Sequence, residues 1–480
     1  MNPDVSRSSR KFPEVPQNSS CMKISTLKRI SKSPVRVIPL SFFFVIMVGA
    51  LLLMLPISHA PGNEPDFITS LFTATTSVCV TGLVVVDTYA HWSLFGQLVI
   101  LLLIQIGGLS VVAVGAMIMV ITKQKFSFAE RMLLSDALNV DQRRGVLRLL
   151  IRIFTGTFLL EGVGAVLYAI KLVPMLGWGK GLWASLFHAV SAFCNAGMDV
   201  VGPNSMIDLR ESPLMMGVTM ALIVLGGLGF VVWFDVIDRI RAGIRRRYGL
   251  RTILRHLSEH SKLVLIMTLC LILLGTIGIL VAEYHNPETL GQMSLSGKIG
   301  NSLFQSITFR TAGFASIPQD KLTEVSCVFG YLLMFIGGSP VGTAGGVKTV
   351  TAFLIIMNVR TYIGGKKENV IFNRRVSDDA MQKAAAIVFF SFAMVVLMTL
   401  LLMTRGDIAL TDALYEITSA MGTVGLSRNL TPNLDTFGRI IVIISMYLGR
   451  IGPISMAIFF VKPSATDIRI RHAVGHFYVG

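Results

Sequence analysis

The chain has 480 residues, of which 53% are hydrophobic and only 15% are charged, with a mean hydropathy of +0.68. This composition excludes a series of ordinary soluble domains. The net charge of +16 at pH 7 leaves two interpretations open, a basic surface for nucleic acid or a membrane protein with positively charged loops.

The placement of the charges along the chain favours the membrane protein. Most of the Lys and Arg residues fall into five segments, 1–36, 123–152, 239–262, 360–383 and 462–480, and the loops between them are net acidic. This alternation follows the positive-inside rule and predicts an even number of crossings with both termini in the cytoplasm. We therefore expect a multi-pass protein of a bacterial plasma membrane, with cytoplasmic tails at 1–36 and 462–480 and no nucleic-acid partner.

Long apolar runs begin after the first of these tails. A helix needs about 20 residues to cross a hydrocarbon core of about 30 Å. The apolar runs predict eight such helices, near residues 37–58, 92–122, 146–175, 213–238, 260–284, 325–359, 380–404 and 436–461.

Between the helices of each consecutive pair lies a segment that recurs four times. The copies are Ser70–Gly82, Ser185–Gly197, Ser302–Gly313 and Ala413–Gly425, and in each an aromatic residue precedes the final glycine by nine or ten positions. A second marker, usually containing a glycine pair, follows each copy at Ile106–Leu109, Leu225–Leu228, Ile336–Ser339 and Leu448–Ile451. Two markers that recur in the same order indicate an internal repeat.

Each repeat is predicted to contain a long helix, a short amphipathic helix, a glycine-containing turn and another long helix. The short helix cannot span a bilayer, so it must re-enter, and its turn must line a water-filled path or be buried in protein. The predicted fold is an all-α multi-pass membrane protein with four membrane–pore–membrane repeats in a pseudo-fourfold arrangement around one pore. The repeats are expected at 37–122, 146–238, 260–359 and 380–461.

The four turns have the chemistry of a cation filter. Rings of backbone carbonyls can replace the hydration shell of an ion, and glycine allows the backbone to direct successive carbonyls inward. The C-terminal ends of the short helices also favour a cation. No ring of carboxylates is present, which argues against a calcium-type filter. The predicted filter residues are Val80, Thr81, Gly82, Asn195, Ala196, Gly197, Thr311, Ala312, Gly313, Thr423, Val424 and Gly425.

These repeats resemble those of the Trk/Ktr/HKT family of potassium transporters over residues 37–462. In that family a glycine in all four filter turns accompanies potassium selectivity, whereas a serine in the first turn accompanies sodium; here the first is Gly82. The absence of an additional helix pair before the first repeat makes the chain most similar to the Ktr membrane subunits. The resemblance implies K⁺ uptake through a carbonyl filter, with Na⁺ dependence or symport.

A glycine-rich stretch interrupts the second long helix of the third repeat. So many small residues and a proline cannot sustain a helix, and a break at membrane depth should line the pore. We interpret this stretch as an intramembrane gate loop, with a merely kinked helix as the alternative, and the family resemblance implies the same loop. Its candidate residues are Gly337, Gly338, Ser339, Pro340, Gly342, Thr343, Ala344, Gly345, Gly346 and Lys348.

Arg450 stands where the other repeats have the second glycine of the pair. A charge at membrane depth is costly and usually functional. We predict that Arg450 lies near the ion path, bonds carbonyls of the loop and prevents tight trapping of cations. A structural ion pair with Glu161, the one carboxylate inside a predicted span, is the alternative.

Other residues carry weaker signals. Cys79 and Cys194 share one repeat position, which favours packing over redox control, and Arg310 at the same position is expected to pair with an outer acid. Asp199 either attracts cations at the outer mouth or caps a turn. His188 is expected to be packed or hydrogen-bonded.

Three rival functions are weighed against potassium transport. A membrane enzyme would need convergent acids, histidines or nucleophiles, and the sequence carries no such motif or P-loop. A receptor would not need four re-entrant turns. A sodium-conducting member of the same family is the nearest alternative.

The resemblance also implies partners. Ktr-type subunits form homodimers on a cytosolic ring of nucleotide-binding, RCK-type regulatory subunits. The basic segment 239–255 offers a docking face, or else contacts anionic membrane lipid. No cofactor is expected in this chain, because K⁺, with Na⁺ as a second candidate, is its substrate.

Overall fold

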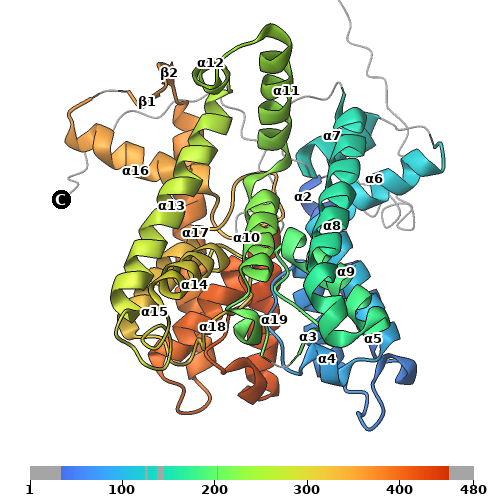
Figure 1. The fold of residues 1–480 in the computed structure, drawn as a ribbon. Coiled ribbons are helices and arrows are strands. Elements are labelled where there is room, and N and C mark those ends of the chain that lie inside the picture. Colours follow the sequence, from blue (N-terminus) through green and yellow to red (C-terminus); the bar gives the residue numbers. More distant parts are fainter. Residues whose placement is uncertain (1–33, 125–127, 138–144, 203, 367, 453–480) are drawn as a thin grey trace, which may run out of the picture.

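A computed structural model describes residues 34–124, 128–137, 145–202, 204–366 and 368–452 (Figure 1). In that part of the chain the structure is helical except for one short hairpin, in which β1 (Val370–Ile371) pairs antiparallel with β2 (Arg374–Arg375). Residues 1–33 of the predicted N-terminal tail, the whole tail 462–480, and residues 453–461 of the last predicted helix lie outside the described residues.

Each repeat begins with a long outer helix. Apolar side chains on these helices face outward, for example Phe44, Val166, Ile277 and Phe389, which are 66%, 67%, 61% and 68% exposed. An apolar outer surface of this kind suits lipid and not water. The outer helices are α2 (Pro34–Leu53), α8 (Val146–Leu176), α13 (Glu259–Glu283) and α17 (Asp378–Met403).

The second helix of each repeat is short and buried, and we call it the pore helix. The pore helices occupy one half of the molecule, at the bottom of Figure 1. Asp66 and Ser294 cap the first and third pore helices, because their side chains accept the orphan amides of the first turn. The four are α3 (Phe67–Cys79), α9 (Trp178–Cys194), α14 (Leu295–Thr308) and α18 (Leu410–Gly422).

The last part of each repeat is an inner helix, and the structure breaks three of them within the described residues. The predicted continuous helix 92–122 consists of α5 (Leu94–Gly108) and α6 (Val111–Ile121), bent by 96°, and 213–238 consists of α10 (Pro213–Leu228) and α11 (Phe230–Arg246), bent by 100°. The expected break in the third repeat separates α15 (Glu324–Phe335) from α16 (Thr349–Ile363). The fourth inner helix is α19 (Thr436–Ile451).

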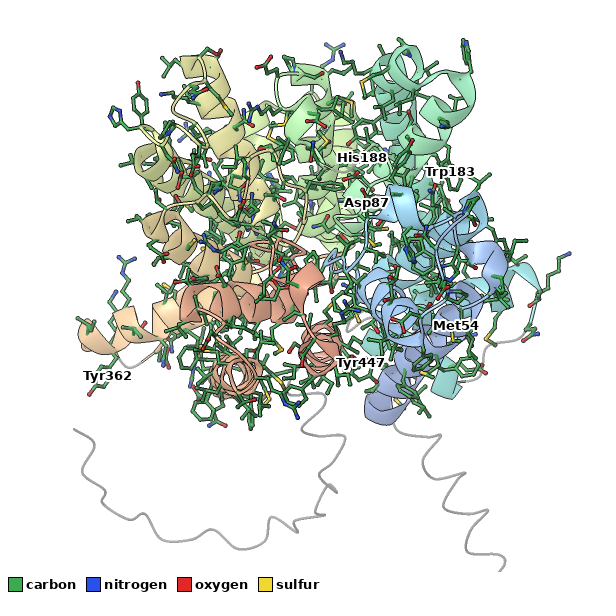
Figure 2. All side chains as sticks on the ribbon, turned by 90° about the horizontal axis from the view of Figure 1, so that it is seen from below. Met54, Asp87, Trp183, His188, Tyr362 and Tyr447 are labelled. Carbon is green, nitrogen blue, oxygen red and sulfur yellow. The ribbon has the colours of Figure 1, made fainter. Side chains whose placement is uncertain are left out.

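The repeats close into a ring. Each pore helix contacts the inner helix of the preceding repeat: α9 packs on α5, α14 on α10, α18 on α15, and α3 on α19. Seen from the pore-helix end, the repeats fill four quadrants around one centre (Figure 2). The chain is therefore an all-α protein of four pore-helix repeats around a central axis, as predicted.

Three of the described helices, α8, α13 and α17, are each long and apolar enough to span a membrane. If each bent pair counts as one span, the described residues contain up to five, and α2, α15 and α16 are shorter apolar helices. The eight crossings remain a prediction. The remaining elements are η1 (Pro56–Ser58), α4 (Thr88–His91), α7 (Phe128–Ala137), η2 (Ile207–Leu209), α12 (Leu250–Arg255) and η3 (Thr431–Asn433).

Candidate ion pathway

Each pore helix is followed by a left-handed residue at the start of its predicted filter turn. These residues are Val80, Asn195, Thr311 and Thr423, with φ between 51° and 69°. In repeats 1, 2 and 4 the amide after this residue bonds back to the helix, for example Thr81 N to Thr76 O at 2.8 Å, which is a Schellman ending. The helix ends consequently present their backbone to the centre of the ring.

The four filter glycines face one another in a closed order. A Cβ atom added to Gly82 would lie 2.5 Å from the carbonyl oxygen of Ala196, and one added to Gly197 would lie 2.7 Å from that of Ala312. Gly313 and Gly425 meet the carbonyls of Val424 and Thr81 in the same way. All four glycines have positive φ, from 66° to 100°. Any side chain here would overlap the next repeat, which explains why all four positions are glycine.

Hydroxyl groups of the pore helices support the turns from behind. Thr76 Oγ1 accepts the amide of Gly82 at 2.9 Å, and Ser419 Oγ accepts the amide of Gly425 at 3.1 Å. Ser191, at the same offset in the second repeat, accepts the amide of Met198 at 3.1 Å. The third repeat has Ile307 at this offset, and there the Thr308 hydroxyl donates to Phe314 O at 2.7 Å. The structure thus brings the twelve predicted filter residues together in four turns, three of which have a hydroxyl acceptor behind them.

The glycine pairs of the second marker also have a structural reason. Gly107, Gly226 and Gly449 press against the carbonyls of Val78, Phe193 and Met421 near the ends of the pore helices, so closely that a Cβ atom could not fit. The inner helices can approach the filter turns only because this position carries no side chain. This contact explains why a glycine recurs at this position in the first, second and fourth repeats.

The breaks in the first two inner helices were missed from the sequence, although the signal is present there. Three residues after the first glycine of each pair, Ser110, Gly229 and Gly452 have positive φ of 78°, 86° and 92°. The third repeat has Pro340 at that position and Val341 at φ 63°. A recurring glycine or serine at this offset marks where the chain leaves the helix.

The predicted gate loop, residues 337–348, lies against the break in the second repeat; we keep this name for the segment below. The amides of Ser339 and Thr343 donate to the carbonyls of Gly227 and Gly226 at 3.0 and 3.1 Å, and the amide of Phe230 donates to Val341 O at 3.1 Å. The Ser339 hydroxyl donates to the carbonyls of Gly227 and Leu228.

The loop also lies close to two filter turns. Thr343 Oγ1 donates to Phe193 O at 3.2 Å, next to the second turn. Gly345 meets the side chain of Thr423, the first residue of the fourth turn, so closely that no Cβ would fit. A cavity of about 200 Å³ borders the end of the loop and is lined by Gly346, Lys348 and residues of α17 and α18.

Arg450 joins the loop to the first repeat. Its Nη1 donates to Thr343 O and its Nη2 donates to Gly107 O, both at 2.6 Å. Glu161 instead accepts from Gln105 at 3.1 Å and lies 3.8 Å from Cys194 Sγ, and among the described residues no ion pair joins it to Arg450. Arg450 therefore bonds one loop carbonyl, as predicted, and the alternative ion pair with Glu161 is not observed among the described residues. Its role in the ion path stays a prediction.

The weaker candidates are placed as follows. The predicted pairing of Arg310 with an outer acid is not found in the described part of the chain. Arg310 is buried, and its Nη2 donates to Gly337 O at 3.2 Å, because the side chain turns toward the neighbouring loop. Asp199 caps a turn by accepting the amide of Val201 at 3.4 Å. His188 packs between the rings of Tyr168 and Phe314.

The cysteines pack behind the filter. Cys79 and Cys194 are fully buried, and Cys194 Sγ would lie 2.6 Å from a Cβ atom added to Gly108. Among the described residues no group of three or more potential ligands could hold a metal ion.

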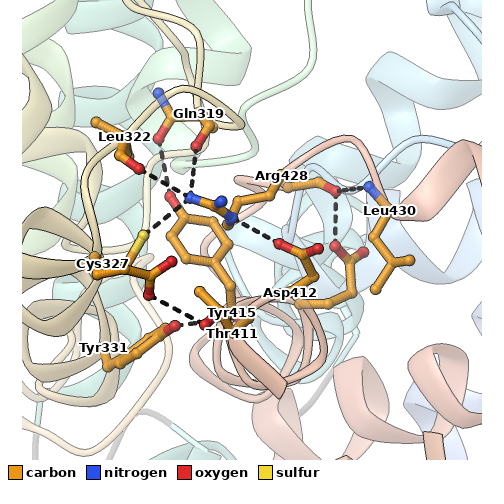
Figure 3. A network of polar contacts seen from close by, with 12 residues as sticks. Gln319, Leu322, Cys327, Tyr331, Thr411, Asp412, Tyr415, Arg428 and Leu430 are labelled. Atoms are coloured by element: carbon orange, nitrogen blue, oxygen red, sulfur yellow. Dashed lines mark hydrogen bonds and ion pairs between the residues drawn. The ribbon is translucent and has the colours of Figure 1, made fainter. Parts of the chain in front are cut away.

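A polar cluster around Arg428, which was not predicted from the sequence, joins the third and fourth repeats beside the filter (Figure 3). Arg428 Nε pairs with Asp412 at 2.7 Å, and Nη1 donates to the carbonyls of Gln319 and Leu322 at 3.4 and 3.3 Å. The Tyr415 hydroxyl donates to Gln319 Oε1 at 2.9 Å. Arg428 lies three residues after the fourth filter glycine, so the cluster joins the segment that follows this turn to the loop before α15.

Comparison with known proteins places the chain among cation transporters. The sequence model of the TrkH family, described as a cation transport protein, matches residues 25–469. The chain is 39% identical over 447 residues to the Ktr system potassium uptake protein B of Bacillus subtilis, which covers 93% of this chain and 97% of that protein. It is 37% identical to the potassium/sodium uptake protein NtpJ of Enterococcus hirae, over 88% of this chain and 92% of that protein.

A solved structure has the same fold. The crystal structure of the potassium transporter TrkH from Vibrio parahaemolyticus matches with a TM-score of 0.70 and 14% identity, over 90% of this chain and 85% of that one. At this identity the match supports the architecture and not the details of the site.

Proposed function

Because this chain belongs to the TrkH family of cation transport proteins, which are integral membrane proteins and not enzymes, we propose that it is the ion-conducting subunit of a potassium uptake system. The observation that carries the proposal is the closed ring of four filter turns, in which each glycine faces a carbonyl of the next repeat. Carbonyl rings of this kind select among cations by replacing their water.

In this proposal the three residues that end at each filter glycine form the selectivity filter. Glycine in all four turns favours K⁺, and the relative from Bacillus subtilis is named a potassium uptake protein. The name of NtpJ includes sodium as well, which keeps a sodium-conducting function as the second candidate.

The experiment is uptake in cells that lack their own potassium transporters, followed by flux in proteoliposomes with and without Na⁺. The chain should restore growth at low K⁺, and excess Na⁺ should not compete with K⁺. Stimulation by Na⁺ would support sodium-dependent uptake. Na⁺ flux that K⁺ does not inhibit would instead establish the sodium-conducting alternative.

The second part of the proposal is that residues 337–348 gate the path, with Arg450 and Lys348 holding the loop in place. The loop lies against the second and fourth filter turns, and the cavity of about 200 Å³ beside Gly346 gives it room to move. Deleting residues 340–344 should raise unregulated flux. If this variant shows the wild-type flux and the wild-type regulation, the loop is not the gate.

The third part concerns orientation and partners. We propose repeats at 37–122, 146–238, 260–359 and 380–461, with both termini cytoplasmic and a homodimer seated on a cytosolic nucleotide-binding ring. The docking face would be the exposed arginines of α11 and α12. Replacing Arg245, Arg246 and Arg251 by glutamine should abolish regulation by the ring and leave flux of the isolated subunit intact. A variant that still binds the ring would assign these residues to lipid contact.

A further inference from the structure

Arg310 is a buried cation that the function proposed above leaves without a role. It stands three residues before the third filter glycine, where the other repeats carry small residues, Cys79, Cys194 and Gly422. The side chain is only 8% exposed. Three repeats therefore show that this position does not need a large side chain to form a filter turn.

The guanidinium is directed to the neck of the gate loop. At this neck, which we define as 336–338 together with 347–349, the two ends of the loop are tied by backbone bonds. Gly337 N donates to Val347 O at 3.0 Å, and Thr349 N donates to Gly338 O at 3.1 Å. Arg310 Nη2 donates to the carbonyl of Gly337 at 3.2 Å, so it holds one strand of the neck.

Arg310 has little else to satisfy its charge. Among the described residues no carboxylate forms an ion pair with it, and its Nε atom is buried without a hydrogen-bond partner. The negative end of α14 and the Gly337 carbonyl are the acceptors that remain. A buried cation gains strongly from each acceptor, so movement of the neck would leave this charge poorly satisfied.

A small cavity leaves room for such movement. It measures about 20 Å³ and is lined by Arg310, by Gly338 of the neck, by Gly227 at the break of the second inner helix, and by Thr268 of α13. The hydroxyl of Thr268 is also buried without a partner. The rest of its lining is aliphatic, from Ile223, Val224, Ile272 and Ile307. The neck therefore borders a small, incompletely packed space of mixed polarity on the side of Arg310.

We propose that Arg310 is a positioning residue that locks the neck of the gate loop to the third filter turn. Arg450 holds the middle of the same loop at Thr343 from the fourth repeat, whereas Arg310 holds its base from the third. Because Arg310 directly precedes Thr311, a shift of the neck is transmitted to the filter through the one peptide unit that joins these residues. The inference rests on the proposed function of the loop as a gate.

The test measures ⁸⁶Rb⁺ flux in proteoliposomes at several K⁺ concentrations. R310M should raise basal flux about tenfold, and the shift of the neck should weaken discrimination against Na⁺. R310K keeps the charge and one donor and should restore at least half of the difference. T268V changes the same cavity without removing a hydrogen bond, and its flux should stay within twofold of wild type.

A double variant separates this inference from the gate proposal. When residues 340–344 are deleted, R310M should add less than a twofold change, because the neck that Arg310 holds then no longer carries the part of the loop that closes the path. An undiminished effect of R310M in that background would show that Arg310 acts on the filter or on folding, and would overturn the inference.

If the deletion alone changes nothing, the gate proposal fails irrespective of Arg310. Should R310M not accumulate in the membrane, R310Q replaces it with the same expectations.

Discussion

The filter turns and the gate loop are both irregular, glycine-rich backbone at the level of the pore, but they are held in different ways. Each filter turn is the end of its own pore helix and meets the next turn through backbone atoms. The gate loop depends on contacts from other repeats, including the side chains of Arg450 and Arg310. Backbone that packs on backbone has few alternative arrangements, whereas a loop held by a few side chains can be released.

This difference predicts which substitutions abolish transport and which deregulate it. In the filter a change should act by steric overlap. In the loop it should act by removing hydrogen bonds, each worth about 1.5–3 kcal/mol when one partner is charged. The following predictions test that division, from the largest effect to the smallest.

The largest effect is expected for Gly197→Ala. The new Cβ would lie 2.6 Å from Gly313 Cα, which forces the second and third turns apart, so K⁺ uptake should fall about 100-fold. Gly62→Ala is the matched control: Gly62 also has positive φ, but a Cβ there meets nothing within 4 Å. Both variants carry the backbone strain, roughly 1–2 kcal/mol, and only one carries the overlap. Equal loss of uptake in the two would refute the steric explanation.

The next effect concerns Arg450→Met. Loss of the bonds to Thr343 O and Gly107 O should release the loop. Since about 1.4 kcal/mol corresponds to a factor of ten, basal flux should rise about tenfold or more. Removing the positive charge should also lower the apparent KM for K⁺. Arg439→Met, near the N-terminal end of the same helix, is the control and should leave both quantities unchanged. If Arg450→Met has the basal flux and the KM of the wild type, Arg450 does not act on ions in the path.

A smaller effect within the filter is expected for Thr76→Val. The substitution leaves the buried amide of Gly82 without its acceptor, at a cost of about 1 kcal/mol, so discrimination of K⁺ from Na⁺ should weaken about fivefold. Thr75→Val is the control, because the Thr75 hydroxyl bonds only Leu71 O within its own helix. Competition of Na⁺ with ⁸⁶Rb⁺ uptake measures both. If Thr75→Val changes selectivity as much as Thr76→Val, the filter does not depend on this hydroxyl.

The features that were predicted correctly from the sequence are those that depend on one local property, such as the positive φ of glycine or the length of an apolar run. The four filter glycines, the pore helices and the interrupted third inner helix follow from glycine spacing and apolar length. The breaks at Ser110 and Gly229 were not predicted, because both residues lie within long apolar runs that are typical of a continuous helix. The bends occur where the inner helix closely approaches a pore helix, and this contact is not apparent from the sequence. The inward turn of Arg310 and the cluster at Arg428 depend on residues far apart in the chain, which no local pattern could reveal.

The smallest functional effect is expected for substitution of Arg428. It tests whether the polar cluster beside the filter contributes to the stability of the fold or to K⁺ selectivity. Arg428→Gln removes the ion pair with Asp412 and the bonds to two carbonyls. The side chains of Arg428 and Asp412 are 12% and 35% exposed. A loss of about 1 kcal/mol should lower the Tm by roughly 2–4 °C, while flux and K⁺ selectivity stay within twofold.

Arg375→Gln, which breaks only exposed pairs, should shift the Tm by less than 1 °C, since such pairs contribute about 0–1 kcal/mol. The double variant Arg428→Gln/Asp412→Asn should be little worse than Arg428→Gln alone, because both changes remove one interaction. A large loss of selectivity at unchanged Tm would instead mean that the polar cluster around Arg428 determines the position of the fourth filter turn. The filter would then depend on side chains from a neighbouring repeat, as the gate loop does.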